Sequence, residues 1–302
     1  MYQTHFGLSE LPFSLTPDTQ FYVDLPSHRE ALNVLLLALQ NGEGFIKITG
    51  PVGSGKTMLC RKLLNELPAP FQTLYIPNPH LAPNDLLFAI ADELGLNYRA
   101  NTQINRIQHQ INHYLLKAAA NGIKPVVIID EAQAMPLETL EALRLLSNLE
   151  TEKQKLLQII LFGQSELNEL LNHASIRQLK QRISFSYNLK PLSKQDVQHY
   201  LHSRLRCAEA DNPDLFNQST AYMLHRHSQG ILRLVNLLAH KSLLSAYGKG
   251  SSYISAKHVR RAVQDTAEAL PEHSIFMCRP SFLIALLTAL LLFMANFPEF
   301  RL

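Results

Sequence analysis

A glycine-rich turn between an expected strand and an expected helix is the first stretch of this sequence that could do chemistry. The letters GPVGSGKT, residues 50–57, fit the pattern G-x-x-x-x-G-K-[ST], which is typical of loops that hold phosphate chains. Backbone N–H groups can converge on an anion there if Gly53 and Gly55 adopt conformations closed to larger residues. The N-terminus of the following helix adds partial positive charge. We expect Lys56 to reach the β and γ phosphates of a bound nucleotide and Thr57 to offer its hydroxyl to Mg²⁺. The predicted nucleotide contacts are Gly50, Pro51, Val52, Gly53, Ser54, Gly55, Lys56, Thr57 and Met58.

Two adjacent acids form the second motif. The letters VVIIDEAQ place Asp130 and Glu131 at the C-terminal end of an apolar run, where ligands bind in α/β sheets. Asp130 is suited to hold Mg²⁺ through its water shell, and Glu131 is suited to polarise the water that attacks the γ phosphate. The two acids could instead belong to a solvated turn. Beside a phosphate loop, however, they predict hydrolysis as well as binding.

These motifs need strands that end at one edge of a sheet. Helical patterns separate the apolar runs, and this alternation predicts an α/β fold with a parallel sheet. Ser27 with Glu30 predicts a capping box at the start of the first long helix, which Gly42 ends. The run Val126–Ile129 has no polar alternation, which is typical of a strand covered on both faces. The expected strands cover residues 44–50, 71–77, 124–129, 156–164 and 184–192.

From Ser193 the pattern changes to helices alone, with Ser193 and Ser255 as expected caps. We therefore predict a nucleotide-binding α/β domain over residues 1–190 and a helical lid over 191–268. Residues 269–302 are expected to be a linker followed by a hydrophobic C-terminal helix.

Composition narrows the class of protein. The net charge is +3, and the basic excess lies in residues 191–268, which carry 10 Lys and Arg against 6 Asp and Glu. This mild bias neither requires nor excludes DNA. The three cysteines are widely spaced and odd in number, which favours a reducing compartment over a disulfide framework. The polar N-terminal stretch does not fit a secretory signal, so we expect the body of the protein in the cytoplasm.

The order of the motifs resembles that of AAA+ ATPases, because a helical lid containing GILRLVN follows the phosphate loop and the acid pair. More narrowly, FGLSELPFSLTPDTQFYVDLPSHREAL, GEGFIKITGPVGSGKT and LEALRLLSNLET resemble the general secretion pathway protein A family. Within that family, the chain is similar to the members that accompany mannose-sensitive haemagglutinin pili. The resemblance covers roughly residues 1–268. It implies a P-loop NTPase of the AAA+ type, with a five-stranded parallel sheet and a C-terminal α-helical lid.

The resemblance also implies roles for three further residues. Gln164, after the fourth strand, takes the sensor 1 place, where its amide would contact the γ phosphate and the attacking water. Arg182, before the fifth strand, takes the place of a finger that completes a neighbouring subunit's site, and Arg177 competes for that role. Arg233 matches sensor 2 on the lid. The alternatives are a polar residue at a strand end, a solvated helix arginine and a lid salt bridge.

The end of the chain is far more hydrophobic than the rest. Residues 281–297 would make a helix of about 25 Å, which is within the spanning range of a bilayer. We expect this segment to anchor the cytoplasmic body to the bacterial inner membrane; a buried helix packed on the lid or on a partner is the alternative. Longer family members continue through a membrane segment into a peptidoglycan-binding domain. Since this sequence stops at Leu302, we expect no direct binding to the cell wall.

The predicted function is that of an AAA+ ATPase which supports assembly of a type IV-like pilus or a type II secretion machine. It would act as a homo-oligomer with an inner-membrane assembly protein as its partner. A DNA-associated AAA+ regulator resembling transposition ATPases is the alternative. Residues 1–190 are close to neutral, with 16 Lys and Arg against 17 Asp and Glu, so nucleic acid is not the expected partner. A nucleotide-gated scaffold with negligible hydrolysis is a third alternative.

Overall fold

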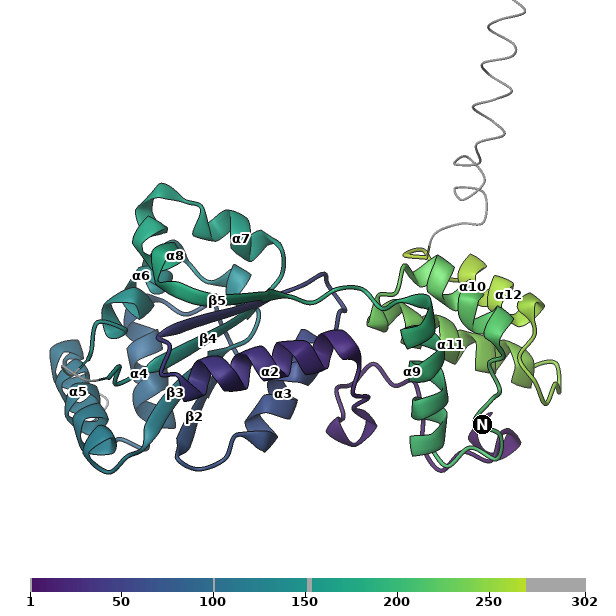
Figure 1. The fold of residues 1–302 in the computed structure, drawn as a ribbon, viewed down its shortest axis with the longest axis horizontal. Coiled ribbons are helices and arrows are strands. Elements are labelled where there is room, and N and C mark those ends of the chain that lie inside the picture. Colours follow the sequence, from purple (N-terminus) through teal and green to yellow (C-terminus); the bar gives the residue numbers. More distant parts are fainter. Residues whose placement is uncertain (1, 100, 151–153, 270–302) are drawn as a thin grey trace, which may run out of the picture.

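The computed structural model describes residues 2–99, 101–150 and 154–269, which form an α/β unit beside a helical unit (Figure 1). The sheet order is β2-β3-β4-β1-β5, and every neighbouring pair is parallel. The predicted five-stranded parallel sheet is therefore confirmed. Its strands are β1 Phe45–Thr49, β2 Phe71–Ile76, β3 Lys124–Ile129, β4 Gln158–Gly163 and β5 Ile183–Asn188.

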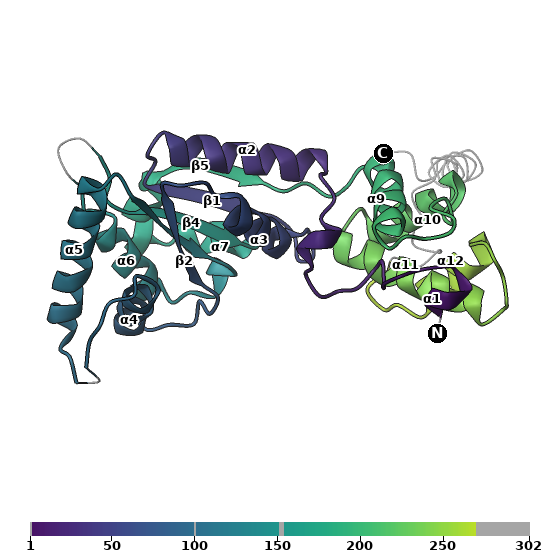
Figure 2. The ribbon, with the colours of Figure 1, turned by 90° about the horizontal axis from the view of Figure 1, so that it is seen from below.

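Helices cover both faces of this sheet, and Figure 2 shows α2 and α4 on opposite sides of it. One face packs on α2, Pro26–Gln40, and α3, Lys56–Glu66, through a core that includes Leu35, Ile48 and Leu59. Burial on two sides explains why β3 and β4 are apolar without alternation, whereas the edge strand β5 is only half-buried. The other face packs on α4 Pro83–Glu93, α5 Ile104–Ala120, α6 Leu137–Leu146, α7 Glu166–Leu171 and α8 Arg177–Arg182.

The start of α2 differs from the prediction. Its N-cap is Leu25, with Pro26 in the first turn, and no side chain caps it, so the expected Ser27–Glu30 capping box is wrong. Ser27 Oγ instead accepts the backbone N–H of Lys190 at 3.1 Å. Glu30 accepts the hydroxyl of Tyr187 at 2.7 Å. Proline is well suited to the first turn of a helix, because it has no backbone N–H that would need a cap there. The side chains of Ser27 and Glu30 are therefore free to hydrogen-bond to the end of β5 and the residues that follow it.

The lid begins at the expected cap. Ser193 and Asp196 form a capping box at α9, Lys194–Cys207, and Ser255 and His258 form one at α12, Ala256–Gln264. Helices α10, Gln218–Ser228, and α11, Leu232–Tyr247, lie between them.

The N-terminal segment packs on the lid, although it falls within the predicted domain 1–190. It contains α1, Tyr2–His5, and a short 3-10 helix, η1, Thr19–Phe21. Both views place α1 beside the lid helices (Figures 1 and 2). Phe6, Phe13 and Phe21 share one buried cluster with apolar side chains of α9 and α11. The chain therefore starts at the lid, crosses to the sheet and returns to the lid.

Within the ranges that the structure describes, no helix combines the length and apolarity needed to cross a bilayer. The predicted anchor, residues 281–297, lies outside those ranges.

Candidate functional site

The phosphate loop lies between β1 and α3, at the carboxyl edge of the sheet. Gly53 and Gly55 have φ angles of +76° and +94°, so both occupy the left-handed region that favours glycine. Gly55 is the N-cap of α3, and Lys56 is its first residue. The loop thus has the backbone that the sequence predicted, ending at a helix N-terminus suited to an anion.

Lys56 lies within this loop and is 4% exposed. Its Nζ donates to the carbonyls of Gly50 at 3.0 Å and Pro51 at 2.9 Å. Burial lowers the pKa of Lys56, while the nearby charges of Glu131 and Asp130 act in the opposite direction. Among the residues that the structure describes, this buried ammonium bonds to two neutral carbonyls, so a charged phosphate oxygen would be a stronger partner for it.

His28, on α2, supports the loop from behind. Its Nε2 lies 3.0 Å from the carbonyl oxygen of Ser54, and because a carbonyl only accepts, this nitrogen must carry the proton. His28 is 2% exposed, and burial lowers its pKa, so the ring is kept neutral. Nothing in the local sequence points to His28, because its contact is formed only when α2 packs against the loop.

Asp130 lies beyond the end of β3 and is 4% exposed. Burial raises its pKa, and hydrogen bonds from the Thr57 side chain and the Glu131 backbone partly offset that effect. The Glu131 N–H donates to Asp130 Oδ1 at 2.9 Å. The structure therefore brings together the two residues, Thr57 and Asp130, that were predicted to serve Mg²⁺.

Glu131 has a φ of +54°, an uncommon backbone conformation for a non-glycine residue. Its Oε2 accepts two side-chain amides, from Gln133 at 2.6 Å and from Gln164 at 2.8 Å. Gln164, predicted to contact phosphate and water, thus contacts Glu131 in this structure. Gln133 is absent from the predicted site, although it lies in the DEAQ letters that pointed to Asp130 and Glu131.

Arg233 reaches the site from the lid. Its backbone N–H donates to the Gly53 carbonyl at 3.0 Å, and its side chain pairs with Glu268 at 3.4 Å. Both groups of that ion pair are about half exposed, so its contribution to stability is small.

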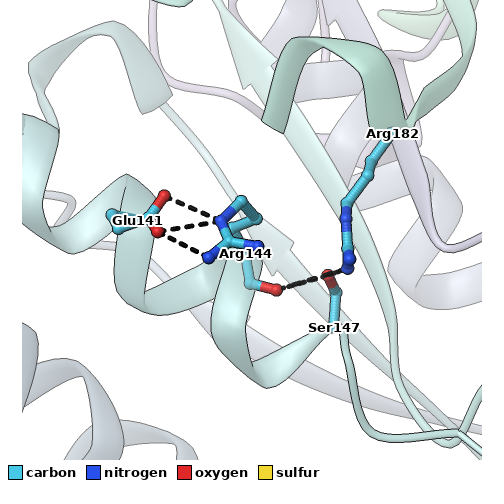
Figure 3. Close-up of polar contacts among 4 residues, drawn as sticks. All are labelled: Glu141, Arg144, Ser147 and Arg182. Atoms are coloured by element: carbon cyan, nitrogen blue, oxygen red, sulfur yellow. Dashed lines mark hydrogen bonds and ion pairs between the residues drawn. The ribbon is translucent and has the colours of Figure 1, made fainter. Parts of the chain in front are cut away.

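Arg182 lies elsewhere, at the end of α8. Its guanidinium donates to Ser147 Oγ at 2.8 Å and points toward α6, where Arg144 pairs with Glu141 (Figure 3). It does not converge with the other predicted site residues. Arg177, its competitor, lies in the first turn of α8 beside Lys180.

A cavity of about 260 Å³ opens above the phosphate loop. One wall is made by Lys56, Thr57, Met58 and Glu131 and the other by the lid, including Arg233. The N-terminal segment closes the cavity with residues 14–17 and 21–23. Sequence reasoning missed this third wall, because the segment has no helical or strand periodicity.

Comparison with known proteins shows the family to which the chain belongs. Residues 39–171 match the family described as an AAA domain. The chain is 44% identical over 254 residues to general secretion pathway protein A of Aeromonas hydrophila. The match covers 84% of this chain but 46% of that protein, so the chain spans about half the length of its curated relative. The resemblance predicted from the sequence is confirmed.

Solved structures extend the likeness of fold. Cdc6p of Pyrobaculum aerophilum has a TM-score of 0.66 at 18% identity, covering 84% of this chain and 70% of its own. The Aeropyrum pernix ORC2 protein has a TM-score of 0.60 at 16% identity, covering 86% and 74%. The Thermotoga maritima RuvB Holliday junction branch migration motor has a TM-score of 0.57 at 17% identity, covering 85% and 77%. At these identities the likeness shows the fold alone: a P-loop core of the AAA+ type with a helical lid.

Proposed function

Because this chain has the fold of AAA+ P-loop proteins and is similar in sequence to general secretion pathway protein A, we propose that it binds and hydrolyses ATP. The observation that carries the proposal is the placement of Lys56. Its buried Nζ is held on two loop carbonyls beneath a cavity that Glu131 also lines. A polyphosphate offers this buried cation charged acceptors, which bind an ammonium more strongly than neutral oxygens do.

Different residues of the chain would bind the phosphates, hold Mg²⁺ and activate the water. The loop N–H groups and Lys56 bind the phosphates, and Glu131 accepts a proton from the attacking water. The Thr57 hydroxyl and Asp130 fit Mg²⁺, which when bound supplies positive charge to the phosphates. The N-terminal segment and the lid line the cavity and shield it from bulk solvent. Gln164 orients the water together with Glu131, and Arg233 brings positive charge from the lid.

The test is phosphate release from ATP by the full-length chain. We expect turnover by the wild type and a loss of at least about 100-fold in Glu131→Gln, since general base catalysis contributes about 10² to 10⁴. Replacement of Glu138, an acid in the first turn of α6, by Gln is the matched control. Equal rates for wild type and Glu131→Gln would refute hydrolysis at this site.

We further propose that the protein acts as a homo-oligomer in which Arg182 serves a neighbouring subunit. Arg182 points toward α6 (Figure 3) and is not among the residues that line the cavity of its own subunit. Its permanently charged planar fork suits phosphoryl charge. Mixing Arg182→Ala protein with Glu131→Gln protein should restore part of the activity, because some interfaces would combine two intact halves. Mixing Arg177→Ala with Glu131→Gln tests the competitor in the same way. No recovery with Arg182→Ala in a verified mixed oligomer would remove this role.

The cellular role we propose is support of pilus or type II secretion assembly at the inner membrane. The similarity to general secretion pathway protein A supports this proposal. Residues 281–297 would anchor a cytoplasmic body beside its assembly partner. Full-length protein should stay with membranes after a carbonate wash, whereas a chain ending near Pro271 should not. Release of the full-length protein by carbonate would contradict the anchor.

The solved structures add little support to the alternative function, that of a DNA-associated regulator. The likeness to the Aeropyrum pernix ORC proteins, one of them solved in complex with DNA, and to the RuvB Holliday junction branch migration motor is at 16–19% identity and concerns the fold. A salt-sensitive shift of DNA by the pure protein would be needed to revive it.

A further inference from the structure

Gln133 lies between the two side chains predicted to handle the attacking water. Its side-chain carbonyl accepts the backbone N–H of Gln164 at 2.9 Å. Its amide nitrogen donates to Glu131 Oε2 at 2.6 Å. A backbone N–H can only donate, so the oxygen of Gln133 must face Gln164 and its nitrogen must face Glu131. The two hydrogen bonds therefore determine which end of the Gln133 amide is the oxygen and which is the nitrogen.

Gln133 and Gln164 share one acceptor. The Gln164 side-chain amide donates to the same Oε2 of Glu131 at 2.8 Å. Both described hydrogen bonds of this carboxylate therefore use Oε2. With Oε2 fixed by two donors, the other oxygen is the one left to meet a water in the cavity that Glu131 lines.

The backbone around Gln133 is shaped for this contact. Glu131, with its φ of +54°, is the N-cap of η2, Ala132–Ala134, and this sharp turn carries Gln133 back toward β4. The end of β4 is Gly163, where an added Cβ would lie 3.2 Å from the Gln133 carbonyl oxygen and 2.7 Å from Leu167 Cδ2. The turn at η2 and the glycine at the end of β4 together leave room for the side-chain amide of Gln133.

We propose that Gln133 is a positioning residue for the hydrolytic step. It acts through Glu131, whose carboxylate it holds beside the side chain of Gln164. This inference rests on the proposed ATPase function. Gln133 sets the direction of the Glu131 carboxylate and makes no contribution to nucleotide binding. Its loss should lower kcat while leaving the affinity for ATP unchanged.

The test uses the full-length chain with Gln133→Glu. This variant keeps an acceptor for the Gln164 N–H but places a second carboxylate oxygen against Glu131, where a donor is needed. We expect kcat to fall about 10- to 100-fold, because misplacing a reacting group by about 1 Å costs up to that much. The Kd for a fluorescent ATP analogue should match the wild type, and the Tm is measured in parallel because the two adjacent carboxylates repel each other. Gln40→Glu, which makes the same change on the exposed end of α2, should have wild-type kcat.

A double-mutant cycle separates positioning from a general structural effect. In a Glu131→Gln background, adding Gln133→Glu should cause no further loss in single-turnover rate, since the group it orients is already disabled. Gln133→Met is a second variant, of similar length but without an added charge, for use if Gln133→Glu lowers the Tm. It should show the same loss of kcat, because it too removes the donor to Glu131.

Three results would overturn the inference: an unchanged kcat, a loss that is additive with Glu131→Gln, or an equal loss of ATP affinity. If the wild type binds ATP but does not hydrolyse it, the proposed function fails instead, and Gln133 has no step to position.

Discussion

The backbone N–H of Arg233 donates to the carbonyl of Gly53 at 3.0 Å, which joins the first turn of lid helix α11 to the phosphate loop. A Cβ on Gly53 would lie 2.6 Å from Arg233 Cβ, so the lid rests directly on the loop. Glycine is required at this position both for the φ of +76° and for the close approach. Loop conformation and lid placement are therefore coupled at one residue.

Gly53→Ala tests this coupling. We expect the lid to be pushed from the loop and ATP affinity to fall about tenfold or more, in addition to a backbone cost of about 1–2 kcal/mol. Gly122→Ala is the matched control, because Gly122 has a φ of +73° but open space around its Cβ position. It should lose similar stability, measured by urea unfolding, without loss of ATP affinity. Wild-type affinity in Gly53→Ala would contradict the coupling.

Arg204 ties the N-terminal segment to the lid. It is 5% exposed on α9, and its guanidinium donates to the carbonyls of Pro12 at 2.6 Å and Phe21 at 3.4 Å. It also donates to the hydroxyl of Tyr200, which donates to Asn236. These residues form a buried network at the wall of the cavity.

Arg204→Met should therefore destabilise the protein by about 3 kcal/mol, since two buried carbonyls lose a charged donor. It should also weaken ATP binding, because the third wall of the cavity is no longer held. Arg206→Met, two residues along the same helix but exposed, should lie within about 0.5 kcal/mol of the wild type. Urea unfolding and ATP titration measure both effects, and equal behaviour of the two variants would refute the network's role.

The pH dependence of stability follows from His28. Burial lowers its pKa below the ordinary 6.5, so the unfolded chain takes up a proton before the folded chain does. Stability should accordingly be complete above about pH 6.5 and fall as the pH drops through and below that value. Burial lowers the pKa values of His240 and His258 as well, and both add to the same trend.

His28→Gln keeps a donor for Ser54 but removes the titration. The loss of stability between pH 7.5 and 5.5, measured by urea unfolding at each pH, should be smaller in His28→Gln than in the wild type. His113→Gln, on the exposed side of α5, should retain the wild-type loss. A wild-type pH dependence in His28→Gln would show that the buried imidazole is not responsible.

Local pattern was enough to predict the sheet, the loop and the acid pair. Residues 50–57 and 130–131 are contiguous, and β3 and β4 are recognisable from apolar runs alone. What failed or was missed depends on contacts between distant segments. Ser27 bonds to Lys190 rather than capping its own helix, and His28 meets Ser54 only across α2. The N-terminal segment joined the lid through buried aromatic side chains that have no periodicity to reveal their destination.

The central claim is that one site binds ATP through Lys56 and acts on it through Glu131. Equilibrium titration of a fluorescent ATP analogue, without turnover, tests it most directly on wild type, Lys56→Ala and Glu131→Gln. Lys62→Ala, on the same helix, is the control. We predict that Lys56→Ala loses binding, whereas Glu131→Gln and Lys62→Ala bind as the wild type does, because Lys56 is the one of these three residues that supplies positive charge to the phosphates. Equal affinity in Lys56→Ala and the wild type would contradict the account.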